Sequence, residues 1–157
     1  MSVSQQFEQD LETVWTRLLD ADFRVERSLA LGELSASCEI EDSGDRVTVA
    51  MSREVTRELP SVLAKVFNPK QTLKFREEWQ ADGDGWSGTI NITVDGQPVT
   101  LSADMSLQPK GEGCEYRVSH RCKARIPLVG GKVEKFVLSQ TDEGAIQELD
   151  YLKNALG

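Results

Sequence analysis

The sequence contains no long hydrophobic run, and its basic residues are outnumbered by acidic ones. No apolar segment approaches the roughly 20 residues of a membrane-spanning helix, so we expect no stable membrane insertion. The start, MSVSQQFEQD, lacks the basic residues and the apolar stretch of a signal peptide, which predicts a cytoplasmic location. The chain has 18 Lys and Arg against 26 Asp and Glu, a formal net charge of −8. An acidic domain repels phosphate backbones, so we expect no nucleic-acid partner.

Cysteine and histidine are also scarce. The three cysteines, Cys38, Cys114 and Cys122, form no CxxC pair. If the last two share a strand, their positions are about 26 Å apart, which is too far for a disulfide. We therefore interpret the cysteines as free, buried thiols. His120 is the only histidine, and no set of nucleophile, base and orienting residue is visible around it.

Metal-binding patterns are missing as well. The segment DGDG at 82–85 lacks the third ligand and the distal glutamate of a calcium-binding loop. A hairpin turn explains its composition. The sequence therefore predicts no metal site, no cofactor and no assigned catalytic residue.

The chain does have the length and the periodicity of one folded domain, residues 1–157. A weak two-residue alternation predicts a strand at 2–9, and Asp10 is a candidate N-cap for the helix that follows. Helical spacing predicts two short helices, the second with Val25 and Leu29 on its apolar face and Gly32 as its C-cap. The apolar residues of the first helix are Leu11, Val14, Trp15, Leu18 and Leu19.

From residue 33 the hydrophobic period changes from the helical 3.6 to the 2 of a strand. Tight turns such as Asp95-Gly96 separate the alternating segments, which predicts an antiparallel meander. The connection over 56–71 is too long for a turn, and Pro60 there predicts a helical turn or flap. The six predicted strands are 34–41, 46–55, 72–80, 86–94, 99–108 and 114–126.

The alternation places the apolar side chains of these strands on one face and the polar ones on the other. A sheet of this kind must cover its apolar face. We predict that the cover is a C-terminal helix from 132 to about 156, since Pro127 ends the last strand and Gly130 and Gly131 let the chain reverse. Gly144 weakens this helix and predicts either a bend or room beneath it.

The segments EEWQ, LSADMSLQPKGEGCEYRV and IPLVGGKVEKF, in this order of elements, resemble the START-like (SRPBCC) superfamily with its α+β helix-grip fold. The resemblance covers the whole chain. It is strongest to a bacterial branch labelled as a domain of unknown function, in which an I-P-L-V-G-G-K-I-E-type segment precedes the last helix. Residues 126–132 and Glu134 match that segment, with Val133 at the aliphatic position. The resemblance implies an apolar cavity between the sheet and the last helix, used elsewhere for lipids, sterols and polyketides, and implies no reaction.

Three ionisable residues fall on the inward face by strand parity: Arg53, Glu77 and His120. A buried polar group without a partner costs about 1–3 kcal/mol. We therefore predict that these residues form the polar end of a ligand pocket, with Arg53 and Glu77 as an ion pair. Simpler explanations stay open: Arg53 reaches solvent along its stem, a bulge exchanges Glu77 for Glu78, or His120 bonds a carbonyl in a dry core. The predicted ligand-binding residues are Arg53, Glu77, Trp79, Ile92, Met105, Tyr116, His120, Val133, Phe136 and Val137.

We therefore predict that the domain binds or transports a hydrophobic or amphipathic small molecule, such as a lipid, sterol or polyketide, in this cavity. One alternative is an enzyme of the cyclase or hydratase type, with Glu77 or His120 as acid or base. We favour binding over catalysis because no catalytic set is visible.

The other alternative is a protein-binding module that uses the outer face of the last strand. Cross-strand pairing explains part of the basic row on that face if Asp104 lies opposite Arg117. An acidic protein would fit the remainder, but no particular protein partner is indicated. The row consists of Arg117, Arg121, Lys123 and Arg125.

Overall fold

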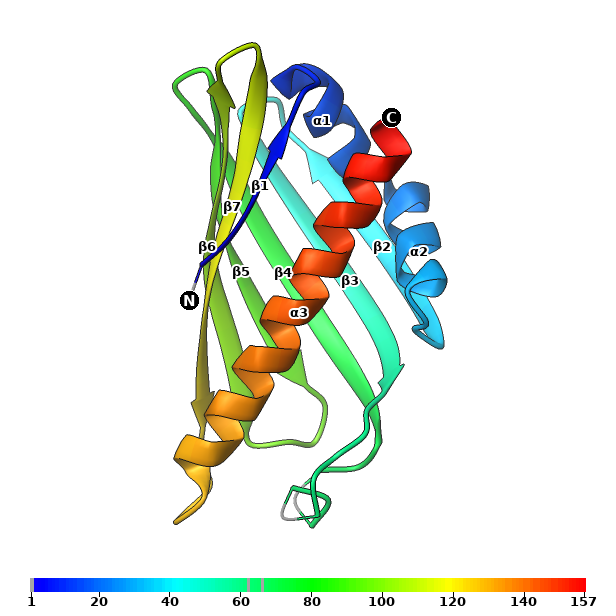
Figure 1. Cartoon of the computed structure of the whole chain (residues 1–157), viewed down its shortest axis with the longest axis vertical. Coiled ribbons are helices and arrows are strands. Elements are labelled where there is room, and N and C mark those ends of the chain that lie inside the picture. Colours follow the sequence, from blue (N-terminus) through cyan, green and yellow to red (C-terminus); the bar gives the residue numbers. More distant parts are fainter. Residues whose placement is uncertain (1, 62, 66) are drawn as a thin grey trace.

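Seven antiparallel strands form one sheet, and the long helix α3 crosses its apolar face diagonally (Figure 1). The computed structural model describes residues 2–61, 63–65 and 67–157. The predicted α+β order of a strand, two short helices, a six-stranded meander and a C-terminal helix is confirmed, and the arrangement matches a helix-grip fold. The elements are β1 (Ser2–Phe7), α1 (Leu11–Leu18), α2 (Ala21–Ala30), β2 (Ser35–Asp42), β3 (Arg46–Thr56), β4 (Lys70–Asp82), β5 (Gly85–Val94), β6 (Val99–Lys110), β7 (Gly113–Ala124) and α3 (Gly130–Leu156).

The strand order is β1-β7-β6-β5-β4-β3-β2, so the first strand pairs with the last one. Tight turns set the register of the meander. The turn between β6 and β7 contains only two residues, which places Ser106 opposite Arg117. The prediction that Asp104 lies opposite Arg117 was therefore wrong by two residues, and Asp104 instead accepts a hydrogen bond of 2.8 Å from Arg121.

The first short helix begins as predicted, whereas α2 begins at Ala21, within the segment DADF where the sequence pattern breaks, and turns an unexpected face inward. Asp10 and Asp20 cap α1 and α2, and each accepts a backbone N–H three residues further on, at 2.9 and 3.1 Å. Leu29 is 48% exposed, so the prediction that Val25 and Leu29 form the inward face of α2 was wrong. The apolar residues of α2 form no single stripe, and its inward-facing Arg24 and Arg27 form ion pairs with Glu77 and Glu148. The buried residues of α2 are Phe23, Arg24, Arg27 and Ser28.

The connection between β3 and β4 contains one helical turn, in agreement with the sequence. The N–H of Ala64 donates to the carbonyl oxygen of Pro60 at 3.0 Å. Leu63 and Phe67 are buried in a small cluster with Val133 of α3. Residues 62 and 66 of the predicted flap lie outside the described residues. The connection thus packs against the first turns of α3.

The chain reverses before α3 in a different way from the one the sequence suggests. β7 ends at Ala124, and α3 begins two residues earlier than predicted, at Gly130. The residue with positive φ is Leu128, at 71°, so the prediction that Gly130 and Gly131 reverse the chain was wrong. Both glycines belong to the first turn of the helix instead. At Gly144 α3 continues unbroken, and a Cβ added there would meet no described atom within 4 Å apart from the adjoining helix backbone. Gly144 also lines a cavity, so the predicted room beneath the helix is present.

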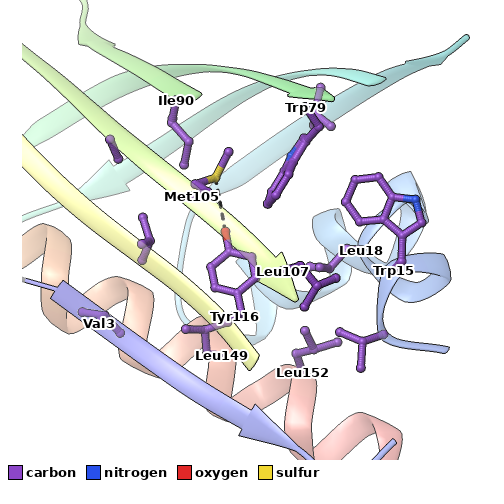
Figure 2. Close-up of a cluster of buried hydrophobic side chains, with 14 of the residues drawn as sticks. Val3, Trp15, Leu18, Trp79, Ile90, Met105, Leu107, Tyr116, Leu149 and Leu152 are labelled. Carbon is purple, nitrogen blue, oxygen red and sulfur yellow. Dashed lines mark hydrogen bonds between the residues drawn. The ribbon is translucent and has the colours of Figure 1, made fainter. Parts of the chain in front are cut away.

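A large cluster of buried hydrophobic side chains lies beside α1 and the C-terminal half of α3 (Figure 2). Trp15 of α1 stacks on Trp86 with ring centroids 4.3 Å apart and meets the edge of Trp79 at 5.2 Å. Leu107 of β6 and Leu152 of α3 are completely buried. Side chains fill this part of the interior. The unfilled space lies further towards the N-terminal half of α3.

Candidate functional site

A cavity of about 190 Å³ lies between the sheet, α2 and α3. Strands β4 to β7 and the N-terminal half of α3 provide its apolar lining. Gly144 is part of the helical wall, and its missing side chain helps keep the space open. The apolar lining includes Leu73, Phe75, Ile90, Ile92, Leu101, Val118, Phe136 and Val137.

Glu77 of β4 is the most enclosed carboxylate of the cavity wall, at 6% exposure. Arg24 of α2 binds both its oxygens, at 2.7 and 3.3 Å, and the indole N–H of Trp79 donates to it at 2.8 Å. Burial alone would raise the pKa of Glu77, but Arg24 and Trp79 outweigh it and lower that pKa. The predicted ion pair of Glu77 with Arg53 was wrong, because the strand register places Arg53 opposite Leu73, four residues along β4.

Glu148 of α3 lies between two other arginines. Arg53 of β3 contacts its carboxylate at 3.1 and 3.3 Å, and Arg27 of α2 contacts it at 3.2 Å. Arg53 also stacks over the ring of Phe75, with its Cζ 4.1 Å from the centroid. Three buried atoms here lack a hydrogen-bond partner within the described part of the chain. They are Nε of Arg27, Nε of Arg53 and Oε1 of Glu33.

Acid should weaken the fold through Glu148. Burial opposes its charge, but Arg53 and Arg27 prevail and lower its pKa to about 2 from an ordinary 4.5. A carboxylate with a lowered folded-state pKa stabilises the protein above about pH 4.5, and this contribution disappears as the pH falls towards 2. We expect Glu148→Gln to lose about 3 kcal/mol of unfolding free energy at pH 7 and to differ little from wild type near pH 2. Urea unfolding across this pH range measures the difference, and a constant difference would contradict the assignment.

His120 of β7 and Asp142 of α3 form a second buried polar pair. Nδ1 of His120 lies 2.9 Å from a carboxylate oxygen of Asp142, and the two residues are 6% and 3% exposed. The aspartate fixes the orientation of the imidazole ring, which also lines the cavity. Tyr116 lies on the same strand face, and its hydroxyl meets the sulfur of Met105 at 3.3 Å (Figure 2). The partner of His120 is thus a side-chain carboxylate, not a backbone carbonyl.

The structure separates the predicted ligand-binding residues into two groups. Three of them, Trp79, Met105 and Val133, are buried within packed clusters and do not line the cavity. Strand parity identifies the inward face, but it cannot tell which part of that face other side chains cover. The seven that line the cavity are Arg53, Glu77, Ile92, Tyr116, His120, Phe136 and Val137.

Sequence reasoning missed the ionisable residues that helices and turns contribute. The inward-facing charges on the strands were a signal for such residues, because a buried charge requires a partner of opposite charge. Helices packed on the apolar face were the remaining source of such partners. Besides Asp142, the missed residues are Arg24, Arg27, Glu33, Arg57 and Glu148.

The arrangement suits recognition better than proton transfer by the glutamates. Arginines hold Glu77 and Glu148 in the ionised form with lowered pKa values, whereas a general base works best with a pKa near the operating pH. Within residues 2–61, 63–65 and 67–157, no three His, Cys, Asp or Glu side chains are grouped to hold a metal ion. None of the described helices has the length and hydropathy to cross a bilayer.

Solved structures from several bacteria share this fold at low sequence identity. Protein TTHA0849 from Thermus thermophilus matches with a TM-score of 0.64 and 14% identity, over 99% of this chain and 95% of that one. Protein CV1439 from Chromobacterium violaceum matches with a TM-score of 0.58 and 15% identity, over 99% and 95% of the two chains. Protein Ms6760 from Mycobacterium smegmatis matches with a TM-score of 0.57 and 12% identity, over 99% of this chain and 88% of that one. These likenesses establish the fold alone.

The family is identified by sequence. The model of the family described as "Protein of unknown function (DUF2505)" matches residues 2–156. The chain therefore belongs to this family, whose label is of the kind that the segment IPLVGGKVE indicated. No curated protein matches the chain.

Proposed function

We propose that this domain is a cytoplasmic START-like protein that binds or transports a hydrophobic or amphipathic small molecule in the cavity beneath α3. The observation that carries the proposal is an unfilled space with an apolar wall and a group of arginines at one end. Such a combination is typical of ligand sites, where apolar surface provides affinity and a few polar groups fix orientation.

The size of the cavity narrows the class of ligand. Its volume of about 190 Å³ is below the roughly 300–1,000 Å³ of pockets for drug-sized molecules. A single alkyl chain or a small aromatic molecule therefore fits the proposal better than a sterol or a phospholipid. The proposed entrance lies between residues 56–71 and α3, where Leu59 and Phe67 join Phe136 in the wall.

Filling the cavity should remove binding without unfolding the protein. Gly144 lies in the cavity wall with open space beyond its Cα, so Gly144→Leu should occupy the ligand's volume. Leucine also favours helix over glycine by roughly 0.5–1 kcal/mol, so the variant should be at least as stable as wild type. We expect its affinity for the uncharged fluorophore phenylnaphthylamine to fall at least about tenfold, measured by fluorescence titration.

Gly131→Leu is the matched control, because Gly131 belongs to the same helix, lies outside the cavity wall and has open space around it. This variant should bind the fluorophore as wild type does. Native mass spectrometry of the freshly purified wild type should in addition detect a bound small molecule. Equal binding by Gly144→Leu and wild type, or a wild type that binds no apolar probe, would overturn the proposal.

A further inference from the structure

The polar end of the cavity carries more positive charge than its own carboxylates balance. Four arginines against three glutamates leave one positive charge in excess, although the chain as a whole has a formal charge of −8. Composition alone favours the opposite sign, so the fold has gathered the arginines at this place. The arginines are Arg24, Arg27, Arg53 and Arg57, and the glutamates are Glu33, Glu77 and Glu148.

These arginines have N–H donors to spare, since each guanidinium carries five. Arg24 is well satisfied by Glu77 and by the carbonyl oxygen of Leu18, at 2.6 Å from its Nε. By contrast, the Nε atom of Arg27 is buried without an acceptor in the described structure, and the Nε atom of Arg53 makes no hydrogen bond but faces the Oε1 of Glu33 at 3.8 Å. Arg57 lines the cavity and forms no ion pair with any residue that the structure describes.

Electrostatics inside the cluster favour one more anion. Burial, together with the nearby guanidiniums of Arg24 and Arg53, lowers the pKa of Arg27 even though Glu148 opposes the shift. The other interior acid, Asp142, is engaged with His120 and lies six residues from Glu148 on α3, about 9 Å along the helix axis. No further carboxylate among the described residues lines the cavity to neutralise the excess charge.

We propose that the arginines at the α2–β3 side of the cavity bind the carboxylate of a small amphipathic acid, whose apolar body lies against β4 to β7 and α3. This inference rests on the proposed function and specifies its ligand class. A head group with a single charge matches the single excess charge, and a planar carboxylate matches the guanidinium fork. The apolar lining, from Ile90 and Ile92 to Phe136, then covers the rest of the ligand.

The test compares ligands that differ only in the head group. Decanoic acid, decanol and decylamine are each titrated against wild-type protein loaded with phenylnaphthylamine at pH 7, and displacement of the fluorophore gives their affinities. The six-carbon and eight-carbon acids, alcohols and amines repeat the comparison at shorter chain lengths. We expect the acid to bind roughly ten- to a hundredfold more tightly than the alcohol of equal length, as for hydrogen bonds to a charged group. The amine should bind most weakly.

Two variants should shift this preference in opposite directions. Arg57→Gln removes the excess charge and should reduce the preference for acid over alcohol at least about tenfold. Glu33→Gln removes a competing carboxylate and should increase it. Arg76→Gln changes the net charge equally on the outer face, where Arg76 pairs with Glu78, and should leave the preference unchanged. Thermal unfolding monitored by circular dichroism verifies that all three variants are folded.

The outcomes separate this inference from the function on which it rests. Equal affinities for acid and alcohol, a preference for the amine, or an unchanged preference in folded Arg57→Gln would overturn the carboxylate assignment and leave the apolar binding function standing. If no acid, alcohol or amine of any length displaces the fluorophore, both proposals are wrong. An acid preference that falls in Arg57→Gln and rises in Glu33→Gln supports the assignment.

Discussion

Replacing Glu77 with alanine is expected to lower the free energy of unfolding by about 3–5 kcal/mol, the usual cost of removing one partner from a buried ion pair. The variant leaves the guanidinium of Arg24 at 3% exposure without its bidentate carboxylate, and Trp79 without an acceptor for its indole N–H. Urea unfolding at pH 7 measures the loss. A total stability of about 5–15 kcal/mol is typical of a domain, so this one substitution removes a large part of it.

Glu78→Ala is the matched control on the next residue of the same strand. Glu78 points to the outer face with an exposed side chain and pairs with Arg76, and exposed pairs contribute about 0–1 kcal/mol. A double variant, Arg24→Met with Glu77→Leu, should recover most of the stability, because apolar residues often replace a buried pair without net cost. If Glu77→Ala costs no more than Glu78→Ala, the buried ion pair is wrong.

Leu152→Ala is the second large effect that we expect, at about 2–5 kcal/mol. Leu152 belongs to α3, is completely buried, and packs in the cluster with Leu18 and Leu107 (Figure 2). Truncation removes apolar contact area and leaves a void, because the surrounding wall of strands and helices relaxes only partly. The denaturant midpoint should fall without a change in the slope of the urea transition.

Ile146→Ala on the same helix provides the comparison. Ile146 is 41% exposed, so its truncation should change stability by no more than about 0.5 kcal/mol. Similar losses for the two variants would mean that α3 is not held to the sheet through the Leu152 face. A shallower transition slope for Leu152→Ala would instead reveal that the helix detaches before the sheet unfolds.

The strands and their inward and outward faces could be predicted because both depend on the pattern of neighbouring residues in the sequence. In β6, residues alternate between inward and outward faces from Val99 to Leu107, and two-residue periodicity is the direct consequence of strand geometry. The same reasoning placed Arg53, Glu77 and His120 in the interior, where they are 6% exposed. It failed for α2, because the inward-facing Arg24 and Arg27 look like the solvent face of an ordinary amphipathic helix.

The partners of the inward charges could not be predicted in the same way. Glu77 and Arg24 are 53 residues apart, and Arg53 and Glu148 are 95 apart. No local pattern links positions so distant in the sequence. Arg53, the nearest ionisable residue on a neighbouring strand, was wrongly assigned to Glu77. Two helices pack on the same face of the sheet: α2 supplies Arg24 as the partner of Glu77, and α3 supplies Glu148 as the partner of Arg53.

By itself the sequence determined that a polar-faced antiparallel meander leads into one long covering helix, since hydrophobic periodicity, turn residues and the IPLVGGK segment are properties of neighbouring residues. Only the tertiary structure decided that the space under Gly144 stays open and that four arginines meet three glutamates around it. Side-chain volumes and charges from α2, β3 and α3 combine there, and whether they fill or line a space depends on the packing angle and register of all three elements.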